Sequence, residues 1–186
     1  SPCTMEFSGT SVIEGASPDN TWLILSDPVA IAEVVPGCKF IAPADEVDDP
    51  SSYTPPSAAT FPEASPEAVE ARAFEPGREY VALLSVGVGS IKPTFEATIV
   101  IDERSYPVMR ASGDGQGGDS AFSMDSRMEM SETASGVEID WHADVDISGR
   151  LAQMGSTVLD PVAERLVNKF FDQMEERMQR VEEAAT

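Results

Sequence analysis

The chain has 186 residues, of which 33 are acidic and 12 basic, so its formal net charge at pH 7 is −21. That length is enough for one domain with a proper core. The charge disfavours nucleic acid and anionic membrane surfaces as partners, because binding them needs a basic face. The acidic residues are spread along the chain and only three basic residues are lysine. Repulsion among so many carboxylates would destabilise the folded chain in dilute salt. In molar salt the Debye length is about 3 Å and this repulsion is screened, so we expect a halophilic protein.

Cysteine content and apolar runs limit the class of protein further. Cys3 and Cys38 are too few for a disulfide scaffold and lack the C-x-x-C spacing typical of zinc sites. No apolar run approaches the roughly 20 residues of a membrane span. We interpret Ser1 to Thr4 as a tag remnant before a native start at Met5. The expected protein is cytoplasmic and soluble, with at most peripheral membrane contact.

The chain opens with a strand over 5–13, followed by two helix-start signals. Ser17 precedes Pro18 and Asp27 precedes Pro28, and each pair combines a capping side chain with a proline at the first helical position. These signals predict two short helices, the second over 29–34. Two short helices after one strand fit a connector across one end of a sheet.

Residues 43–77 differ in composition from the rest of the chain. They contain seven prolines, many alanines and serines, and few large apolar residues. This composition predicts an irregular acidic insertion without a core of its own. Only Glu67 to Ala73 favours a turn or two of helix, with Ser65 before Pro66 as the capping signal.

Strand signals dominate the next part of the chain and a helix ends it. The clearest strand alternates Val137, Ile139 and Trp141 on one face with Glu138, Asp140 and His142 on the other. The expected strands cover 39–42, 78–88, 92–102, 107–113, 120–130 and 137–148, and the expected helix covers 149–183. The order predicts an α+β fold, with one long helix across a strongly curved antiparallel sheet.

The long helix carries a continuous apolar stripe that the sheet must cover. Its members recur every three or four residues from Leu151 to Val181. Pro161 lacks an N–H group, so we expect a kink or break near Leu159. Gly155 is interpreted as a point of close helix–sheet packing or as room for a ligand.

Three polar patterns are better explained by structure than by chemistry. Gly113 to Gly118 matches G-x-G-x-x-G, but a strand follows it, so we expect a hairpin loop with several positive-φ glycines and no nucleotide site. His142 is the only histidine, and its strand parity places it outward among carboxylates as a solvated residue. The acidic pairs Asp45–Glu46 and Asp48–Asp49 lack the spacing of a calcium loop. We therefore expect neither a catalytic residue nor a metal site.

The remaining candidates are apolar side chains that point between sheet and helix. Methionine recurs where surfaces accept variable apolar shapes, so these residues form either an ordinary core or the lining of a ligand cavity. The candidate cavity residues are Phe7, Phe95, Phe122, Met124, Met128, Trp141, Met154, Phe170, Phe171 and Met174.

Several stretches resemble the carbon monoxide dehydrogenase G-subunit family. They are Met5 to Thr10, Asp27 to Gly37, Val88 to Phe95, Gly113 to Gly118 and Val145 to Gly155. That family belongs to the START-like, polyketide-cyclase-like (SRPBCC) superfamily. The resemblance implies a single helix-grip domain over 1–186, similar to START and Bet v 1 proteins, with about seven strands wrapped around the C-terminal helix. It also implies an accessory role to a molybdenum-containing carbon monoxide dehydrogenase, in membrane recruitment or quinone handling.

Three functions remain open from the sequence. The first is a non-catalytic binding protein for a hydrophobic small molecule, such as a quinone or lipid, that serves a redox enzyme of the molybdenum hydroxylase type. The second is a cyclase or hydratase, which needs an acid or base inside the pocket; Arg110 and Arg127 are expected to point outward instead. The third is a structural adaptor without a ligand. We favour the first, with no cofactor other than a bound quinone or lipid.

Overall fold

The structure is a computed structural model that describes residues 3–55, 65–73 and 77–185. In chain order, the elements are β1 (Cys3–Glu14), α1 (Pro18–Leu25), α2 (Pro28–Ile31), β2 (Cys38–Pro43), the 3-10 helix η1 (Ala44–Glu46), α3 (Pro66–Ala73), β3 (Glu79–Ser85), β4 (Thr94–Ser105), β5 (Val108–Gly117), β6 (Ser120–Glu132), β7 (Gly136–Gly149), the 3-10 helix η2 (Ala152–Met154) and α4 (Ser156–Ala185). Cys3 and Thr4 are thus paired residues of β1, opposite Ile147 and Asp146.

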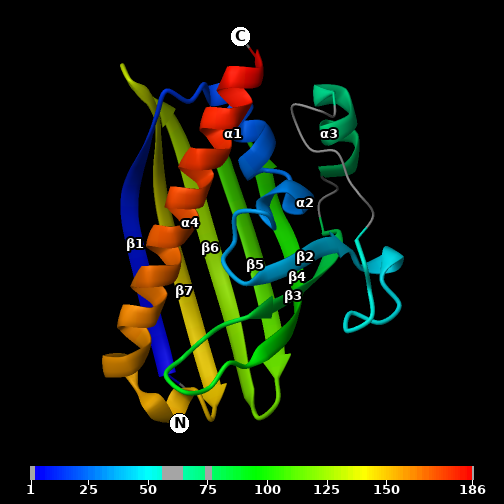
Figure 1. Cartoon of the computed structure of the whole chain (residues 1–186), viewed down its shortest axis with the longest axis vertical. Coiled ribbons are helices and arrows are strands. Elements are labelled where there is room, and N and C mark those ends of the chain that lie inside the picture. The colour runs from blue at the N-terminus through cyan, green and yellow to red at the C-terminus, as the bar shows by residue number, and fades with distance from the viewer. Residues whose placement is uncertain (1–2, 56–64, 74–76, 186) are drawn as a thin grey trace.

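A seven-stranded antiparallel sheet forms the body of the molecule. Its strand order is β1-β7-β6-β5-β4-β3-β2. Figure 1 shows the sheet curving, with α4 lying across its concave face near β1 and β7 and with α1 and α2 beside that helix. The predicted α+β fold, with a curved sheet and a long C-terminal helix, is therefore confirmed.

The two short helices begin at the predicted capping residues. The Ser17 side chain accepts a hydrogen bond from the Asn20 N–H at 3.3 Å, and the Asp27 carboxylate accepts one from the Val29 N–H at 3.1 Å. A proline follows each cap, where its missing N–H costs nothing. The second helix is the four-residue α2 and is shorter than the predicted 29–34.

The long helix differs from the prediction at its start. It begins at Ser156, and the residues before it form η2 and a turn in which Gly155 has φ of +74°. Gly155 therefore ends η2 and does not thin the helix. The predicted break near Leu159 is wrong, because α4 continues through Pro161, and the alternative of a kink there stays a prediction. Pro161 is the sixth residue of α4, so it removes a single hydrogen bond near the helix start and leaves the remaining turns intact.

The glycine-rich stretch is mostly strand, so the predicted loop over Gly113 to Gly118 is wrong. Gly113 to Gly117 belong to β5, and within the stretch only Gly118 has a positive φ, of +60°. The physical reason is close packing on the concave face. An added Cβ at Gly115 would overlap the Phe122 ring, which lies opposite on β6.

The insertion contributes one helix that is attached to the sheet. Ser65 caps α3 as predicted, accepting a hydrogen bond from the Ala68 N–H at 3.2 Å. Arg104 of β4 donates to both carboxylate oxygens of Glu70 at 2.7 Å, and these bonds hold the pKa of Glu70 below its usual value. Val69 is fully buried. This part of the insertion is thus ordered by packing, while 56–64 and 74–76 lie outside the described residues.

Candidate ligand-binding site

The register of three strands places Trp141 near the middle of the concave face. Trp141 of β7 lies opposite Gly9 of β1 on one side and Met128 of β6 on the other. A Cβ added to Gly9 would lie 2.9 Å from Cζ2 of the indole ring. The ring therefore rests on bare backbone at Gly9, which lies within the predicted first strand but is not among the candidate cavity residues.

The helix side of the site consists of aromatic residues on α4. Phe170 and Phe171 pack edge to face, with ring centroids 5.0 Å apart and an interplanar angle of 87°. Phe171 also contacts Trp141, with 6.1 Å between the ring centroids. The three rings join α4 to the sheet, an arrangement typical of favourable aromatic pairs.

The apolar stripe of α4 is unevenly covered by the sheet. Met174, Met178 and Val181 near its C-terminal end are at most 1% exposed. Residues from Val162 to Phe171 on the same stripe are only half-buried. Val158 is 42% exposed, so its predicted place in the buried stripe is wrong. The middle of the helix is thus where apolar surface remains accessible to a ligand.

Trp141 also carries an unsatisfied donor. Its Nε1 atom is buried and has no hydrogen-bond partner among the described residues. Buried polar atoms in folded proteins are nearly always paired, and leaving one unpaired costs about 1–3 kcal/mol. A molecule with an acceptor oxygen beside this N–H group would remove that cost.

The concave face has short side chains beside the aromatic group. Phe7 of β1 faces Ala143 of β7, and the same row continues through Ser126 of β6 and Ala111 of β5. The Ser126 hydroxyl donates a hydrogen bond to the Ala111 carbonyl at 3.1 Å, so its polarity is satisfied locally. This row presents an apolar floor with little side-chain bulk.

The ten candidate cavity residues fall into two groups. Met128, Trp141, Phe170, Phe171 and Met174 pack together in one cluster, and Phe7, Phe95, Phe122 and Met154 belong to a second cluster nearer the β5–β6 turn. Met124 is half-buried on the concave face of β6, between the two groups. Phe95 and Met174 are at most 3% exposed and form core, whereas the other eight are half-buried. A single continuous cavity remains a prediction.

Two pockets in the structure lie away from the helix. One of about 390 Å³ is lined by Lys92, Arg150 and the Gly117–Ser120 turn, among others, at one end of the sheet. A second, of about 270 Å³, includes Phe122 and the strand ends around it. Neither is lined by α4. The half-buried side chains under the helix contact one another instead, so a ligand there would have to displace them.

Polar groups with catalytic potential are directed elsewhere. Arg110 and Arg127 point outward as predicted, paired with Glu103 at 3.0 Å and Glu129 at 3.2 Å. Burial raises the pKa of the Cys38 thiol to about 11. A thiol that stays protonated at neutral pH is a poor nucleophile.

A family model agrees with the arrangement of sheet and helix. The model, described as the G subunit of carbon monoxide dehydrogenase (CoxG), matches residues 73–179. The chain belongs to this family. The matched region runs from the last residue of α3 to the last turns of α4, so it includes Trp141 and Phe171, which lie on the two sides of the candidate site. Gly9 and Phe7 on β1 lie outside it. A search of curated proteins found no match.

Solved structures similar to this CoxG-family chain share its fold at low identity. A conserved protein from Geobacillus kaustophilus has a TM-score of 0.69 and 17% identity, covering 95% of this chain and 96% of its own. The ZhuI aromatase/cyclase from Streptomyces sp. R1128 has a TM-score of 0.53 and 13% identity, and the match covers 97% of this chain and 95% of that one. Ara h 8.0201 has a TM-score of 0.52 and 12% identity, and the match covers 95% of this chain and 99% of that one. These likenesses confirm the predicted helix-grip fold. No helix among the described residues is long and apolar enough to cross a membrane.

Proposed function

We propose that the chain is a non-catalytic binding protein for a hydrophobic small molecule, quinone or lipid-like, accessory to a molybdenum carbon monoxide dehydrogenase-type redox enzyme. The observation that carries the proposal is the buried, unpartnered Nε1 of Trp141 within a half-buried aromatic group. A quinone suits this surface, because its ring and prenyl chain are apolar and its carbonyl oxygens accept hydrogen bonds. Membership of the CoxG family supports the accessory role.

The free energy for binding would come mainly from apolar burial. Each 100 Å² of apolar surface removed from water contributes about 2.5 kcal/mol. Met128, Phe170 and Phe171 are half-buried, so they have surface left to bury against a ligand. Methionine adapts to the shape of its neighbours, which suits side chains that must move apart to admit a prenyl chain. The Trp141 N–H then fixes the orientation of the polar end.

The first test is identification of the bound molecule. Protein from its native host, or reloaded with that host's lipids, is extracted with organic solvent, and the extract is examined by mass spectrometry. We expect a stoichiometric quinone or lipid in wild-type protein and its loss in Phe171→Asp, which places a charge in the aromatic group. An empty extract, together with an unchanged melting temperature when quinones and lipids are added back, contradicts the proposal and favours the adaptor.

The second test isolates the hydrogen bond. Trp141→Phe keeps an aromatic ring but removes the donor, and should weaken quinone binding about tenfold, equivalent to about 1.4 kcal/mol. The comparison variant is Trp22→Phe, because the Trp22 ring packs against Tyr106 and the Arg104 guanidinium. Isothermal calorimetry with a short-chain quinone measures both. Equal affinities for the two variants would show that Trp141 does not contact the carbonyl.

A further inference from the structure

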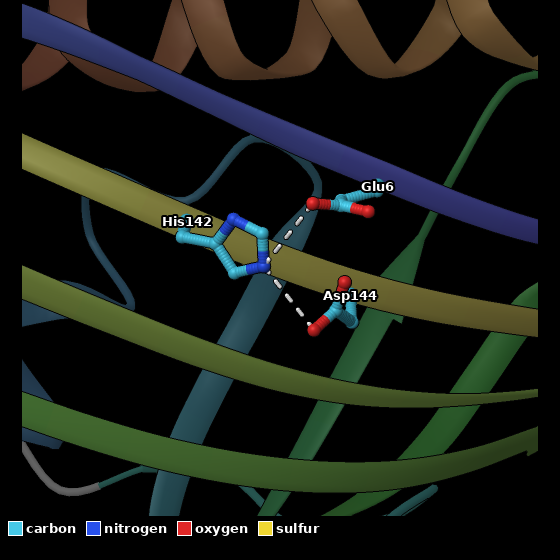
Figure 2. Close-up of side chains that lie close together, drawn as sticks. All are labelled: Glu6, His142 and Asp144. Carbon is cyan, nitrogen blue, oxygen red and sulfur yellow. Dashed lines mark hydrogen bonds and ion pairs between the residues drawn. The ribbon is translucent and has the colours of Figure 1, made fainter.

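A second set of side chains lies on the convex face of the sheet, opposite the ligand site. Nε2 of His142 is 3.2 Å from Oδ2 of Asp144 and 3.9 Å from Oε1 of Glu6. Figure 2 shows the three side chains converging, with Glu6 from β1 and the other two from β7. The donor atoms all lie within 4.8 Å of one another. The β1–β7 register causes this, because Glu6 is directly opposite Asp144 and His142 is two residues away on the same face.

The donor set is one that first-row transition metals prefer. An imidazole nitrogen and two carboxylate oxygens bind Zn²⁺ at about 2.0–2.2 Å, which places neighbouring donors about 3–3.5 Å apart. The 3.2 Å from His142 to Asp144 fits that spacing, whereas the 3.9 Å from His142 to Glu6 exceeds it, and all three donor atoms lie within 4.8 Å of one another. Glu6 and Asp144 have side chains 72% and 56% exposed, so they are free to rotate toward a bound ion.

Among the described residues, the surroundings of the three side chains add negative charge. Asp144 faces Glu6 on one side and Asp125 of β6 on the other, so three carboxylates lie in one row across three strands. Like charges directly opposite each other destabilise a sheet. Arg127 is opposite His142, but its guanidinium is bonded to Glu129 at 3.2 Å. A divalent cation between Glu6, His142 and Asp144 would offset the repulsion.

We propose that Glu6, His142 and Asp144 bind one divalent transition-metal ion, of the Zn²⁺ or Co²⁺ class, on the convex face. Three protein ligands leave further coordination positions for water. The imidazole gives selectivity, because Mg²⁺ and Ca²⁺ take oxygen ligands and gain little from a nitrogen donor. The site stands independently of the hydrophobic ligand, which is proposed for the other face of the same sheet.

The experiment is calorimetric titration of the full chain with Zn²⁺ in molar sodium nitrate, which screens diffuse attraction to the acidic surface. Asp144→Asn and Asp140→Asn are a matched pair, because both remove one carboxylate from the same face of β7 and only Asp144 belongs to the proposed site. We expect one saturable site in wild type and in Asp140→Asn. Asp144→Asn and His142→Gln should weaken it by more than about tenfold, since even the loss of a hydrogen-bond partner of a metal ligand costs about 10–100-fold.

Two further readouts separate a site from surface attraction. Co²⁺ should give a visible absorption band that His142→Gln removes and that excess Mg²⁺ leaves in place. Zn²⁺ should raise the melting temperature of wild type and of Asp140→Asn but not of His142→Gln, whose melting temperature without metal shows that it folds. Non-saturable binding, equal weakening by Asp140→Asn and Asp144→Asn, or displacement of Co²⁺ by Mg²⁺ would each overturn the proposal.

Discussion

A carboxylate near the C-terminal end of α4, that of Glu182, bonds to the start of α1, and this contact can be tested directly. Oε1 of Glu182 accepts hydrogen bonds from the Ser17 N–H and hydroxyl, each at 2.9 Å, and from the Asn20 side chain at 3.1 Å. Ser17 is the residue that caps α1. Glu182 thus places a negative charge at the N-terminal end of α1, where the helix dipole favours it.

Glu182→Ala should lower the free energy of unfolding by about 1–2 kcal/mol. Hydrogen bonds to a charged group contribute about 1.5–3 kcal/mol each when well buried. Here all three share one oxygen of a partly exposed side chain, so solvent screening reduces their sum towards the values for surface pairs. For a chain of this size, the expected loss corresponds to a fall of about 2–8 °C in melting temperature.

The pH dependence supplies a second measurement. Partial burial works to raise the pKa of Glu182, but the hydrogen bonds from Ser17 and Asn20 lower it below the usual 4.5. A carboxylate with a lowered folded-state pKa stabilises the protein above pH 4.5, and this contribution is lost as the pH falls further. The difference between wild type and Glu182→Ala should therefore shrink between pH 5 and pH 3.

Urea unfolding at pH 7 and at pH 3 measures the free energy of unfolding, with Glu176→Ala as the control. Glu176 is an exposed glutamate of the same helix, so its replacement removes an equal charge without breaking the contact to α1. Equal free energies of unfolding for the two variants at pH 7 would refute the reasoning. So would a difference between wild type and Glu182→Ala that is the same at pH 3 as at pH 7.

Two more predictions follow from charge and burial. Transfer from molar to millimolar salt should lower the melting temperature markedly, because opposed carboxylates such as those of Asp144 and Asp125 lose their screening; an unchanged value in a thermal scan would exclude the halophilic interpretation. In a Cys3→Ser variant, Cys38 should react with a disulfide reagent about a hundredfold more slowly near neutral pH than in the unfolded chain, since its pKa is raised from 9.0 to about 11 and the thiolate is the reacting form. Equal rates in folded and unfolded protein would contradict the burial of the thiol.

Local signals predicted most of the elements, because they depend on neighbouring residues. The predicted caps Ser17 and Asp27 are the N-caps of α1 and α2 in the structure. The alternation that begins at Val137 likewise distinguishes the two faces of β7. The errors occur where packing between distant segments decides. Gly115 favours a turn on its own, yet it lies in a strand because it pairs with β4 and β6, and Phe122 on β6 occupies the space a side chain would take.

The candidate site was predictable in kind but not in detail. Periodicity placed Trp141 and Phe171 on facing surfaces, which is sufficient to propose an apolar site. The support of the Trp141 ring by Gly9 depends on the β1–β7 register. Whether the indole N–H finds a partner depends on all the residues that surround the ring, and none of the described residues supplies one. Neither follows from the local sequence. The same holds for Glu6, which the sequence separates from His142 by more than 130 residues.

One pairing register therefore determines both proposed sites. With Gly9 opposite Trp141, the indole lies inward over bare backbone, and the same register brings Glu6 opposite Asp144 on the outer face. A shift of one residue would exchange the faces of β1 relative to β7, placing a larger side chain under the indole and separating Glu6 from His142.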